Sequence, residues 1–226
     1  PIWAMLPATT FAFVQTFPSF TALHQANLAE VLRAWQGLGY NRRAKYLWET
    51  AHYLAAQPPK KQYTAPELEQ LPGIGKGTAG AIIAYAYNLP VVFIETNIRT
   101  VYLHYFFKNM PNVTDGKLLP LIEKNLDKKN PREWYWALMD YGTYLKQQGA
   151  HNRNSAHYSK QSKFQGSLRQ VRGHIMSSLL NEPVPVPISY FYQALPYSKN
   201  NIQNALNHLV QEGLVSKNDK SNYCCV

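Results

Sequence analysis

The chain of 226 residues carries 23 Lys and Arg against 13 Asp and Glu, a formal net charge of +10, and 46% of its residues are hydrophobic. That share is enough for a sizeable core in one large domain or two small ones, and the lack of an apolar run of about 18 residues argues against a membrane span. The positive charge favours a polyanionic partner such as nucleic acid, because a basic surface releases counterions when it covers phosphates.

The first half of the chain is predicted to consist of helices separated by turns. Asn27 and Glu30 have the spacing of a helix-capping box, and apolar residues follow at helical spacing. A further helix is predicted over 44–55, ending before the proline pair at 58–59. Between these helices, the segment 35–43 (Trp-Gln-Gly-Leu-Gly-Tyr-Asn-Arg-Arg) places a tyrosine beside a basic turn.

The segment 71–80 (Leu-Pro-Gly-Ile-Gly-Lys-Gly-Thr-Ala-Gly) is the most informative motif in the chain. Gly73, Gly75 and Gly77 can adopt positive φ and carry no Cβ above the backbone. A large anion can therefore approach the backbone N–H groups closely. The segment does not match a nucleotide-binding loop, because helix rather than strand precedes it and no Gly-Lys-Ser/Thr triplet ends it.

Helices are predicted on both sides of this glycine hairpin. Thr64 and Glu67 have capping-box spacing before it, and 78–87 has helical periodicity after it. A helix, a glycine hairpin and a second helix form a device that grips one DNA phosphate with backbone donors. Lys76 and Thr78 are placed to take part in the same contact.

A second capped helix is predicted to begin at 95–99 (Glu-Thr-Asn-Ile-Arg), after a short apolar segment at 89–94. Glu95 lies twenty residues beyond Gly75. A helix N-terminus favours the ionised form of a carboxylate. Glu95 is therefore a candidate charged group close to the hairpin.

Two more helices are predicted before residue 149. Asp115 is expected to cap the first of them. The second begins at 130–133 (Asn-Pro-Arg-Glu) and carries 137–142 (Ala-Leu-Met-Asp-Tyr-Gly), with Tyr141 expected on its buried side.

The composition changes near residue 150. The segment 151–167 is basic and has no acidic residue, so it is expected to be either a solvated linker or a contact to a DNA backbone. Its two histidines have no third ligand at a sensible spacing, and no metal site is predicted. We therefore expect a domain at 1–150, the basic linker at 151–167 and a module at 168–226.

The module at 168–226 is predicted to hold three helices followed by a two-stranded hairpin, an order typical of a winged helix. A DNA contact and a protein-docking role remain open for it, because the third helix offers only Lys199 and several amides to a base edge. Cys224 and Cys225 are the only cysteines. They exclude a disulfide framework and suit a reducing cytoplasm.

The segments 71–80 and 93–101 resemble the helix–hairpin–helix DNA glycosylases, and 35–40 and 137–142 are similar to adenine DNA glycosylases that act on mismatches with guanine or 8-oxoguanine. The resemblance runs over residues 17–148. It implies a mostly α fold, with a glycosylase domain of two helical subdomains before the small winged-helix-like α+β module. It also implies a monomer that acts on double-stranded DNA with a mismatched or damaged base pair, in the cytoplasm at the nucleoid.

The resemblance assigns chemistry to the hairpin region. A glycosylase breaks the bond between a base and C1′ through an oxocarbenium-like transition state, which needs a nearby carboxylate and a flipped nucleotide. Glu95 lies where the family carries this carboxylate as aspartate, and the alternative is that Glu95 only caps its helix. Its extra methylene adds about 1.5 Å, and a misplacement of about 1 Å can cost about a hundredfold in rate. Gly77 lies where bifunctional relatives carry a lysine nucleophile, so hydrolysis without strand cleavage is expected.

The resemblance also implies DNA contacts. Tyr40 would probe or wedge beside the base opposite the flipped one, with Arg42 and Arg43 near the DNA backbone. The alternative is a buried tyrosine beside a solvated basic face. Asn97 matches a family asparagine next to the catalytic loop, or it caps the helix.

The chain departs from the family in three places. The adenine-contacting glutamate of the family has no counterpart before Glu30, and because the chain begins without methionine, an N-terminal piece that holds it is an open alternative. The family's oxidised-guanine recognition domain is replaced by the module at 168–226. No cysteine lies in 144–151, where many relatives bind an iron–sulfur cluster, so no cofactor is expected. A thymine or uracil mismatch glycosylase and a catalytically weak DNA-binding scaffold therefore remain alternatives.

Overall fold

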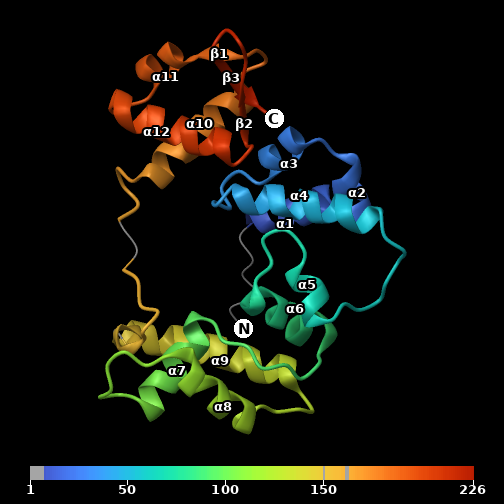
Figure 1. The fold of residues 1–226 in the computed structure, drawn as a ribbon, viewed down its shortest axis with the longest axis vertical. Helices are drawn as coiled ribbons and strands as arrows, with labels where there is room; N and C mark the ends of the chain where they lie inside the picture. The colour runs from blue at the N-terminus through green and yellow to red at the C-terminus, as the bar shows by residue number, and fades with distance from the viewer. Residues whose placement is uncertain (1–7, 150, 161–162) are drawn as a thin grey trace. The chain divides into compact units, whose positions relative to one another are not determined.

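The computed structural model describes residues 8–149, 151–160 and 163–226 (Figure 1). The described chain is mostly helical and forms two compact units, each with its own core. The first unit comprises Pro59–Lys160. The second combines residues 8–58 with residues 163–226, so it is built from the two ends of the described chain.

The first unit is entirely helical apart from its loops. Its elements are α5 (Ala65–Glu69), α6 (Lys76–Tyr87), α7 (Thr96–Phe106), α8 (Asp115–Asn125), α9 (Pro131–Gln148) and the short 3-10 helix η2 (His151–Asn154). The capping box predicted for α5 is present, with the Thr64 backbone N–H and hydroxyl each donating to Glu67 at 2.8 Å. The hydrogen bond from Lys60 and those from Thr64 lower the Glu67 pKa to about 2.

The core of the first unit lies between α7, α8 and α9. Ile98, Leu118 and Ile122 are fully buried in it, and so is Tyr135 of α9. Tyr141, expected on the buried side of α9, is exposed instead. The prediction was wrong because Tyr135 and Gly142 face the neighbouring elements, and this turns the flank of α9 that carries Tyr141 outward.

The backbones of α7 and α9 come very close together at Gly142. A Cβ at position 142 would lie 2.6 Å from the Asn97 carbonyl carbon and 2.8 Å from its Cα, distances that Cβ atoms do not show. Only glycine therefore allows the backbone of α7 to rest on α9 at this point. The glycine of the predicted 137–142 motif has a packing role.

Asp115 does not cap α8 as the sequence analysis expected. Thr114 occupies the cap position, and Asp115 is the first helical residue. The Asp115 carboxylate accepts two hydrogen bonds of 2.8 Å from the guanidinium of Arg99 in α7. These bonds lower the Asp115 pKa, and they tie the start of α8 to α7.

Part of the segment expected to be a linker is built into the first unit. Val113 accepts a hydrogen bond of 2.8 Å from the Ala156 N–H and donates one of 2.8 Å to the Asn154 carbonyl. The Asn154 amide also donates to the Lys108 carbonyl at 2.7 Å, and the Thr100 hydroxyl donates to Asn152 at 2.7 Å. Residues 151–158 are therefore fixed by polar contacts rather than left as a free tether.

The second unit joins four N-terminal helices to the C-terminal module. The N-terminal helices are α1 (Ala8–Thr16), α2 (Phe20–Gln25), α3 (Leu28–Ala34) and α4 (Arg42–Ala55). The module consists of α10 (Leu168–Asn181), β1 (Val186–Pro187), α11 (Ile188–Ala194), α12 (Lys199–Gln211), β2 (Val215–Lys217) and β3 (Asn222–Cys225). Its strands form an antiparallel sheet in the order β1-β3-β2, with Val186 opposite Tyr223 and Ser216 opposite Cys224. The three predicted helices and the hairpin are present, with β1 as an additional strand.

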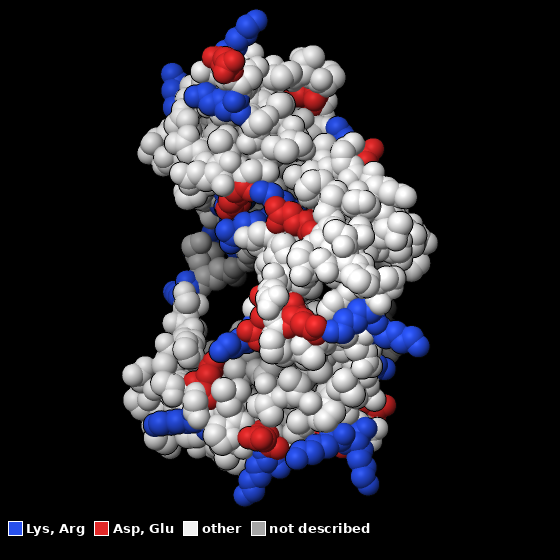
Figure 2. All heavy atoms as spheres, turned by 45° about the vertical axis from the view of Figure 1, so that its right-hand side comes forward, with Lys and Arg blue, Asp and Glu red and all other residues white. Residues whose placement is uncertain are grey.

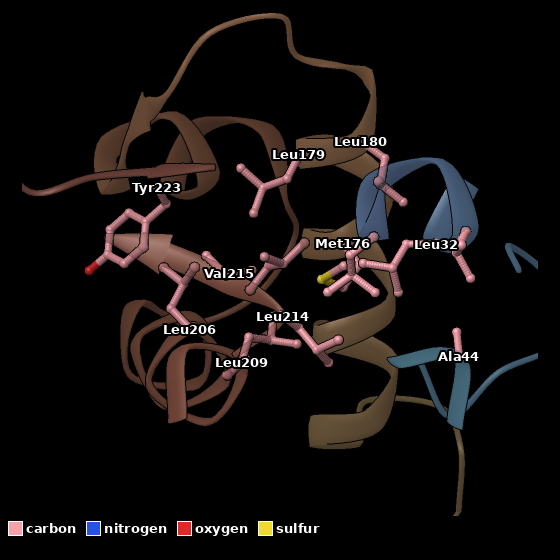
Figure 3. Close-up of a cluster of buried hydrophobic side chains, with 14 of the residues drawn as sticks. Leu32, Ala44, Met176, Leu179, Leu180, Leu206, Leu209, Leu214, Val215 and Tyr223 are labelled. Atoms are coloured by element: carbon pink, nitrogen blue, oxygen red, sulfur yellow. The ribbon is translucent and has the colours of Figure 1, made fainter. Parts of the chain in front are cut away.

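One hydrophobic core spans both parts of the second unit. Leu32 of α3 and Ala44 of α4 belong to the same cluster of buried side chains as Met176 and Leu180 of α10 (Figure 3). Polar bonds support this packing, since the Arg33 Nε donates to the Leu180 carbonyl at 3.2 Å and the Lys45 ammonium donates to the Glu212 carbonyl at 2.6 Å. The compact units therefore do not coincide with the ranges 1–150 and 168–226 expected from the sequence, because composition does not reveal this long-range packing.

No helix within the described ranges is long and apolar enough to cross a membrane. Within the same ranges, no cluster of three or more His, Cys, Asp and Glu side chains could hold a metal ion.

Replacing Gly142 by alanine should destabilise the first unit. Overpacking of this kind costs about 1–3 kcal/mol, because the new methyl group pushes against the Asn97 backbone. Gly173→Ala in α10 is the matched control, since a Cβ there meets nothing within 4 Å and alanine is the better helix former. Chemical denaturation monitored by circular dichroism measures both changes, and equal effects of the two substitutions would contradict the packing role.

Candidate functional site

The glycine hairpin connects α5 to α6 (Figure 1). The Ile74 N–H donates to the Leu71 carbonyl at 3.2 Å, and Gly73 takes the left-handed conformation that this turn requires, with φ 71°. Gly75 is extended, with φ −98° and ψ 177°, and Gly77 lies in the first turn of α6. Of the three glycines expected to use positive φ, only Gly73 does so.

The absence of side chains at the hairpin leaves the start of α6 open. Gly75 is exposed, and a Cβ there would meet nothing within 4 Å. The first backbone N–H groups of a helix have no carbonyl partner within the helix, and here they belong to the turn that carries Lys76 and Thr78, both exposed. Exposed N–H donors beside an ammonium group and a bare glycine suit a phosphate.

The segment before Glu95 packs against α6 at two glycines of that helix. A Cβ at position 80 would lie 2.6 Å from the Phe93 Cγ, so only glycine lets the Phe93 ring rest on the helix. A Cβ at position 77 would lie 3.5 Å from the Ile94 carbonyl oxygen, which is an ordinary contact. The hairpin helix and the residues leading to Glu95 therefore touch directly.

Tyr135 of α9 holds the same segment from the other side. Its hydroxyl donates to the Val91 carbonyl at 2.7 Å and accepts from the Phe93 N–H at 3.3 Å. Its ring centroid lies 4.2 Å from that of Phe93. Burial raises the Tyr135 pKa to about 12, so the hydroxyl keeps its proton and its donor role at neutral pH.

Glu95 is the N-cap of α7. Its Oε1 accepts hydrogen bonds from the Asn97 N–H at 2.5 Å and from the Ile98 N–H at 2.9 Å, and neither of these bonds uses Oε2. The side chain is partly exposed. Capping the helix and presenting a carboxylate oxygen to a ligand are therefore compatible roles for the same group.

Lys146 of α9 lies close to this carboxylate, and the sequence analysis missed it. Its ammonium group donates to the Asn97 side-chain oxygen. Burial lowers the Lys146 pKa, while the charge of Glu95 acts in the opposite direction and raises it. The available signal was the spacing of Lys146, which lies one helical turn beyond Gly142 and so shares the face of α9 that meets Asn97.

Asn97 is the second residue of α7 and does not cap the helix. Its side-chain oxygen accepts from Lys146, and its amide group lies 3.8 Å from the Met139 sulfur. The side chain is therefore held between two residues of α9, next to Glu95. The structure therefore excludes Asn97 as the helix cap, and its role next to a catalytic loop stays a prediction.

A cavity of about 310 Å³ opens beside the first turn of α7. It is lined by Thr96, Arg99, Asn152, Ser155, His157, Tyr158 and Ser159. The Arg99 guanidinium is already engaged by Asp115, and His157 lies 3.8 Å from the same carboxylate. The charges around the cavity are therefore largely compensated.

The second unit carries the predicted residues of the 35–43 segment. Tyr40 is 56% exposed and takes the left-handed conformation with φ 54°, next to Gly39 with φ 70°. The Arg43 guanidinium carbon lies 5.2 Å from the Tyr40 ring centroid, and Arg42 lies 3.7 Å from the Glu212 carboxylate. This exposure rules out the alternative of a buried tyrosine, and the contact of Tyr40 with DNA stays a prediction.

The predicted site residues thus fall into two groups. Gly73, Gly75, Lys76, Gly77, Thr78, Glu95 and Asn97 belong to the first unit, and Tyr40, Arg42 and Arg43 belong to the second. On the face seen in Figure 2, basic and acidic side chains are interspersed rather than gathered into one basic field.

Comparison with known proteins places these features in a family. A model of the HhH-GPD superfamily base excision DNA repair proteins matches residues 3–124. The adenine DNA glycosylase of Buchnera aphidicola subsp. Baizongia pistaciae is 33% identical over 140 residues, which is 59% of this chain and 38% of that protein. The adenine DNA glycosylase of Mycolicibacterium smegmatis is 41% identical over 105 residues, which is 45% of this chain and 32% of that protein.

The match thus spans about two fifths of the length of these relatives or less. A solved structure of a thermostable thymine-DNA glycosylase superposes with a TM-score of 0.49 at 20% identity, covering 60% of this chain and 64% of that one. The resemblance to adenine DNA glycosylases inferred from the motifs is confirmed by these relatives. Because the family model covers more than half of the chain, including the hairpin and Glu95, the chain belongs to the HhH-GPD superfamily of base excision DNA repair proteins.

Proposed function

We propose that the chain is a monofunctional DNA glycosylase that hydrolyses the N-glycosidic bond of adenine mispaired with 8-oxoguanine or guanine, with Glu95 as its catalytic carboxylate. The observation that carries this proposal is the position of Glu95. The residues leading to it pack on the hairpin helix through Gly77 and Gly80, so a phosphate bound at the hairpin would lie in the same rigid unit as the carboxylate. A duplex with a mismatched or damaged pair is the substrate, bound by one copy of the chain at the nucleoid in the cytoplasm.

The reaction needs little more than a fixed negative charge and a water molecule. As the bond between the base and C1′ breaks, the bonding electrons leave with the base and positive charge develops on the sugar. The ionised Glu95 carboxylate stabilises that charge most at the transition state, which is where stabilisation accelerates the step. Water then adds to C1′, giving up one proton through Glu95, and the departing base ends with that proton in the balanced reaction.

Lys146 and the start of α7 keep Glu95 ready for this role. Two backbone N–H bonds to Oε1 hold the carboxylate in place, and its charge interacts with the ammonium charge of Lys146. The bonds also bend the side chain back onto its own helix. This shortens the effective reach of a glutamate at a position where the family carries aspartate.

The proposal includes no cofactor. In relatives with four cysteines a cluster would organise the segment after α9, whereas here hydrogen bonds to Val113, Phe107, Lys108 and Thr100 hold residues 151–158. These bonds support the view that polar contacts within the chain itself hold residues 151–158 in place.

A DNA-binding scaffold without excision is the second candidate function. The observation in its favour is that Glu95 already has a complete structural role as the cap of α7. A panel of duplexes carrying adenine opposite 8-oxoguanine, adenine opposite guanine, and thymine or uracil opposite guanine separates this candidate from the glycosylases. If the chain excised only thymine or uracil, the substrate would be one of these bases and not adenine.

Glu95→Gln should abolish excision while the protein stays folded. The amide oxygen can still accept the two N–H bonds at the start of α7, but it cannot stabilise a cation, and we expect a loss of about a hundredfold or more in single-turnover rate. Duplex affinity should be unchanged in a fluorescence anisotropy titration. Excision at the parent rate would show that the carboxylate is only a cap, and a parent that excises nothing from any duplex would leave the scaffold as the function.

Gly75→Val should weaken binding to every duplex alike, by about tenfold, because phosphate contacts position DNA without reading its sequence. The extended backbone at Gly75 accepts valine, and its Cβ position is open, so folding should be unaffected. Gly116→Val in the first turn of α8 is the matched control at another exposed helix start. Loss of one mismatch with intact binding to plain duplex would contradict the hairpin assignment.

The abasic product should be cut only by alkali, and borohydride should trap no covalent adduct with DNA, because position 77 carries no amine. Gly77→Lys is the positive control, since a side chain there makes only an ordinary contact with the Ile94 carbonyl and would point a lysine toward the Glu95 segment. Adduct formation by the parent that disappears in Lys76→Ala would overturn the monofunctional mechanism.

A further inference from the structure

We propose that Arg169, which lies beyond the part of the chain matched by the family model, is a positioning residue that fixes Tyr40 for insertion into DNA. Tyr40, Arg169 and Phe164 together form the part of the second unit that would probe DNA, which we call the tip. The inference rests on the DNA-binding part of the proposed function. It does not require that excision occurs.

Tyr40 needs outside support in the conformation it adopts. A left-handed backbone is costly for a residue with a large side chain and persists where the surroundings hold it. The ring is mostly exposed, so burial does not hold it. The turn before it is held by the Trp35 indole and the Arg43 guanidinium, which donate to the Gly39 carbonyl at 3.0 and 3.3 Å.

Arg169 supplies the support for the Tyr40 side chain. Its Nη1 donates to the Tyr40 hydroxyl at 2.9 Å, and its guanidinium carbon lies 5.7 Å from the Tyr40 ring centroid. The same guanidinium carbon lies 5.3 Å from the ring of Phe164, which is 57% exposed. One cation thus contacts two exposed aromatic rings, and it fixes the Tyr40 ring at both its hydroxyl and its face.

The guanidinium is not committed to a carboxylate. Among the residues that the structure describes, Arg169 forms no ion pair, and its buried Nε has no hydrogen-bond partner. Arg172 on the same helix, in contrast, pairs with Glu212. The positive charge at the tip is therefore uncompensated, and a polyanion is the partner that would complement it.

The positions of the two segments are fixed within one core. Ser167 caps α10 and its hydroxyl donates to the Phe164 carbonyl at 2.6 Å, which sets Phe164 just before the helix. Glu212 links α10 to α4, because its carboxylate pairs with Arg172 and with Arg42, and its carbonyl accepts from Lys45. Arg169 therefore reaches Tyr40 from a helix that is rigidly tied to the helix following Tyr40.

Two exposed aromatic rings beside a free cation form a surface for stacked bases and phosphates rather than for a protein. Aromatic faces stack on bases of any sequence, and the arginine preserves the ring orientation that insertion requires. The C-terminal module would then contribute to recognition through the start of α10. Its third helix α12, the expected recognition helix, is not needed for this contact.

A double-mutant cycle tests the proposal with Glu95→Gln as the background, so that no excision intervenes. The readouts are duplex affinity and the fluorescence of 2-aminopurine placed beside a mismatch, which rises when the base is unstacked. Tyr40→Phe removes the hydroxyl that Arg169 contacts, Arg169→Met removes the cation, and Tyr40→Ala removes the ring. Lys217→Met is the matched control, because it breaks a comparable contact to the Tyr223 ring elsewhere in the same unit.

We expect Arg169→Met to reduce the 2-aminopurine enhancement about three- to tenfold, the size of one lost hydrogen bond and one cation–π contact. In the Arg169→Met variant, the additional change Tyr40→Phe should reduce the 2-aminopurine enhancement little further, because both changes break the same contact. Lys217→Met should leave the signal at the parent value. Arg169→Lys keeps the positive charge, but it should not give the full 2-aminopurine enhancement of the parent.

Three results would overturn the proposal. One is an unchanged 2-aminopurine signal in Arg169→Met, and another is independent, multiplying effects of Arg169→Met and Tyr40→Phe. The third is an equal loss of affinity for plain and mismatched duplex in Arg169→Met without any change in the 2-aminopurine signal of the bound complex, which marks a simple phosphate contact. An Arg169-dependent signal in a protein that excises no base would uphold this inference while the glycosylase proposal fails.

Discussion

The candidate catalytic site depends on one close backbone contact, between Gly142 of α9 and Asn97 of α7. This contact sets how far the N-terminal turn of α7 lies from α9. It therefore fixes the distance between Lys146 and the Asn97 side chain, and with it the charge that Glu95 experiences. A single methyl group at position 142 would push that turn away. The hydrogen bonds at the start of α7 would still form, but the ammonium group would no longer be aligned with them.

In the proposed function, the side chain of Glu95 serves both the stability of α7 and the chemistry. A carboxylate at a helix N-cap interacts favourably with the N–H groups and the helix dipole, and here the two N–H bonds to Oε1 fix its direction. A free glutamate would sample several rotamers and would place its charge less accurately than an aspartate. Bent back onto α7, it loses that freedom, so the extra methylene costs less in precision than its length suggests.

Local signals in the sequence predicted local structure well. The capping boxes at Asn27 and at Thr64 are present, and the glycine hairpin and the capped start after Glu95 lie where the motifs place them. The failures concern contacts between segments far apart in the chain. Tyr135 rather than Tyr141 is buried, Asp115 pairs with Arg99 instead of capping its helix, and Lys146 reaches Asn97 across the interface of α7 and α9. Helical periodicity identifies an apolar face, but it does not say which neighbour that face will meet.

The shared core of the second unit changes what the C-terminal module can be. A module joined by a flexible tether could be lost without affecting Tyr40, but here Met176 and Leu180 pack with Leu32 and Ala44 on either side of the 35–43 segment (Figure 3). Removing the module would expose that apolar surface and release the turn that bears Tyr40. The glycine hairpin and Glu95 belong to the other unit, so the proposed probing of the base pair and the proposed cleavage of the glycosidic bond would fall in different compact units. A duplex that contacts both would then couple recognition to catalysis through its own stiffness, because DNA bent or unstacked at Tyr40 presents its backbone differently to the hairpin.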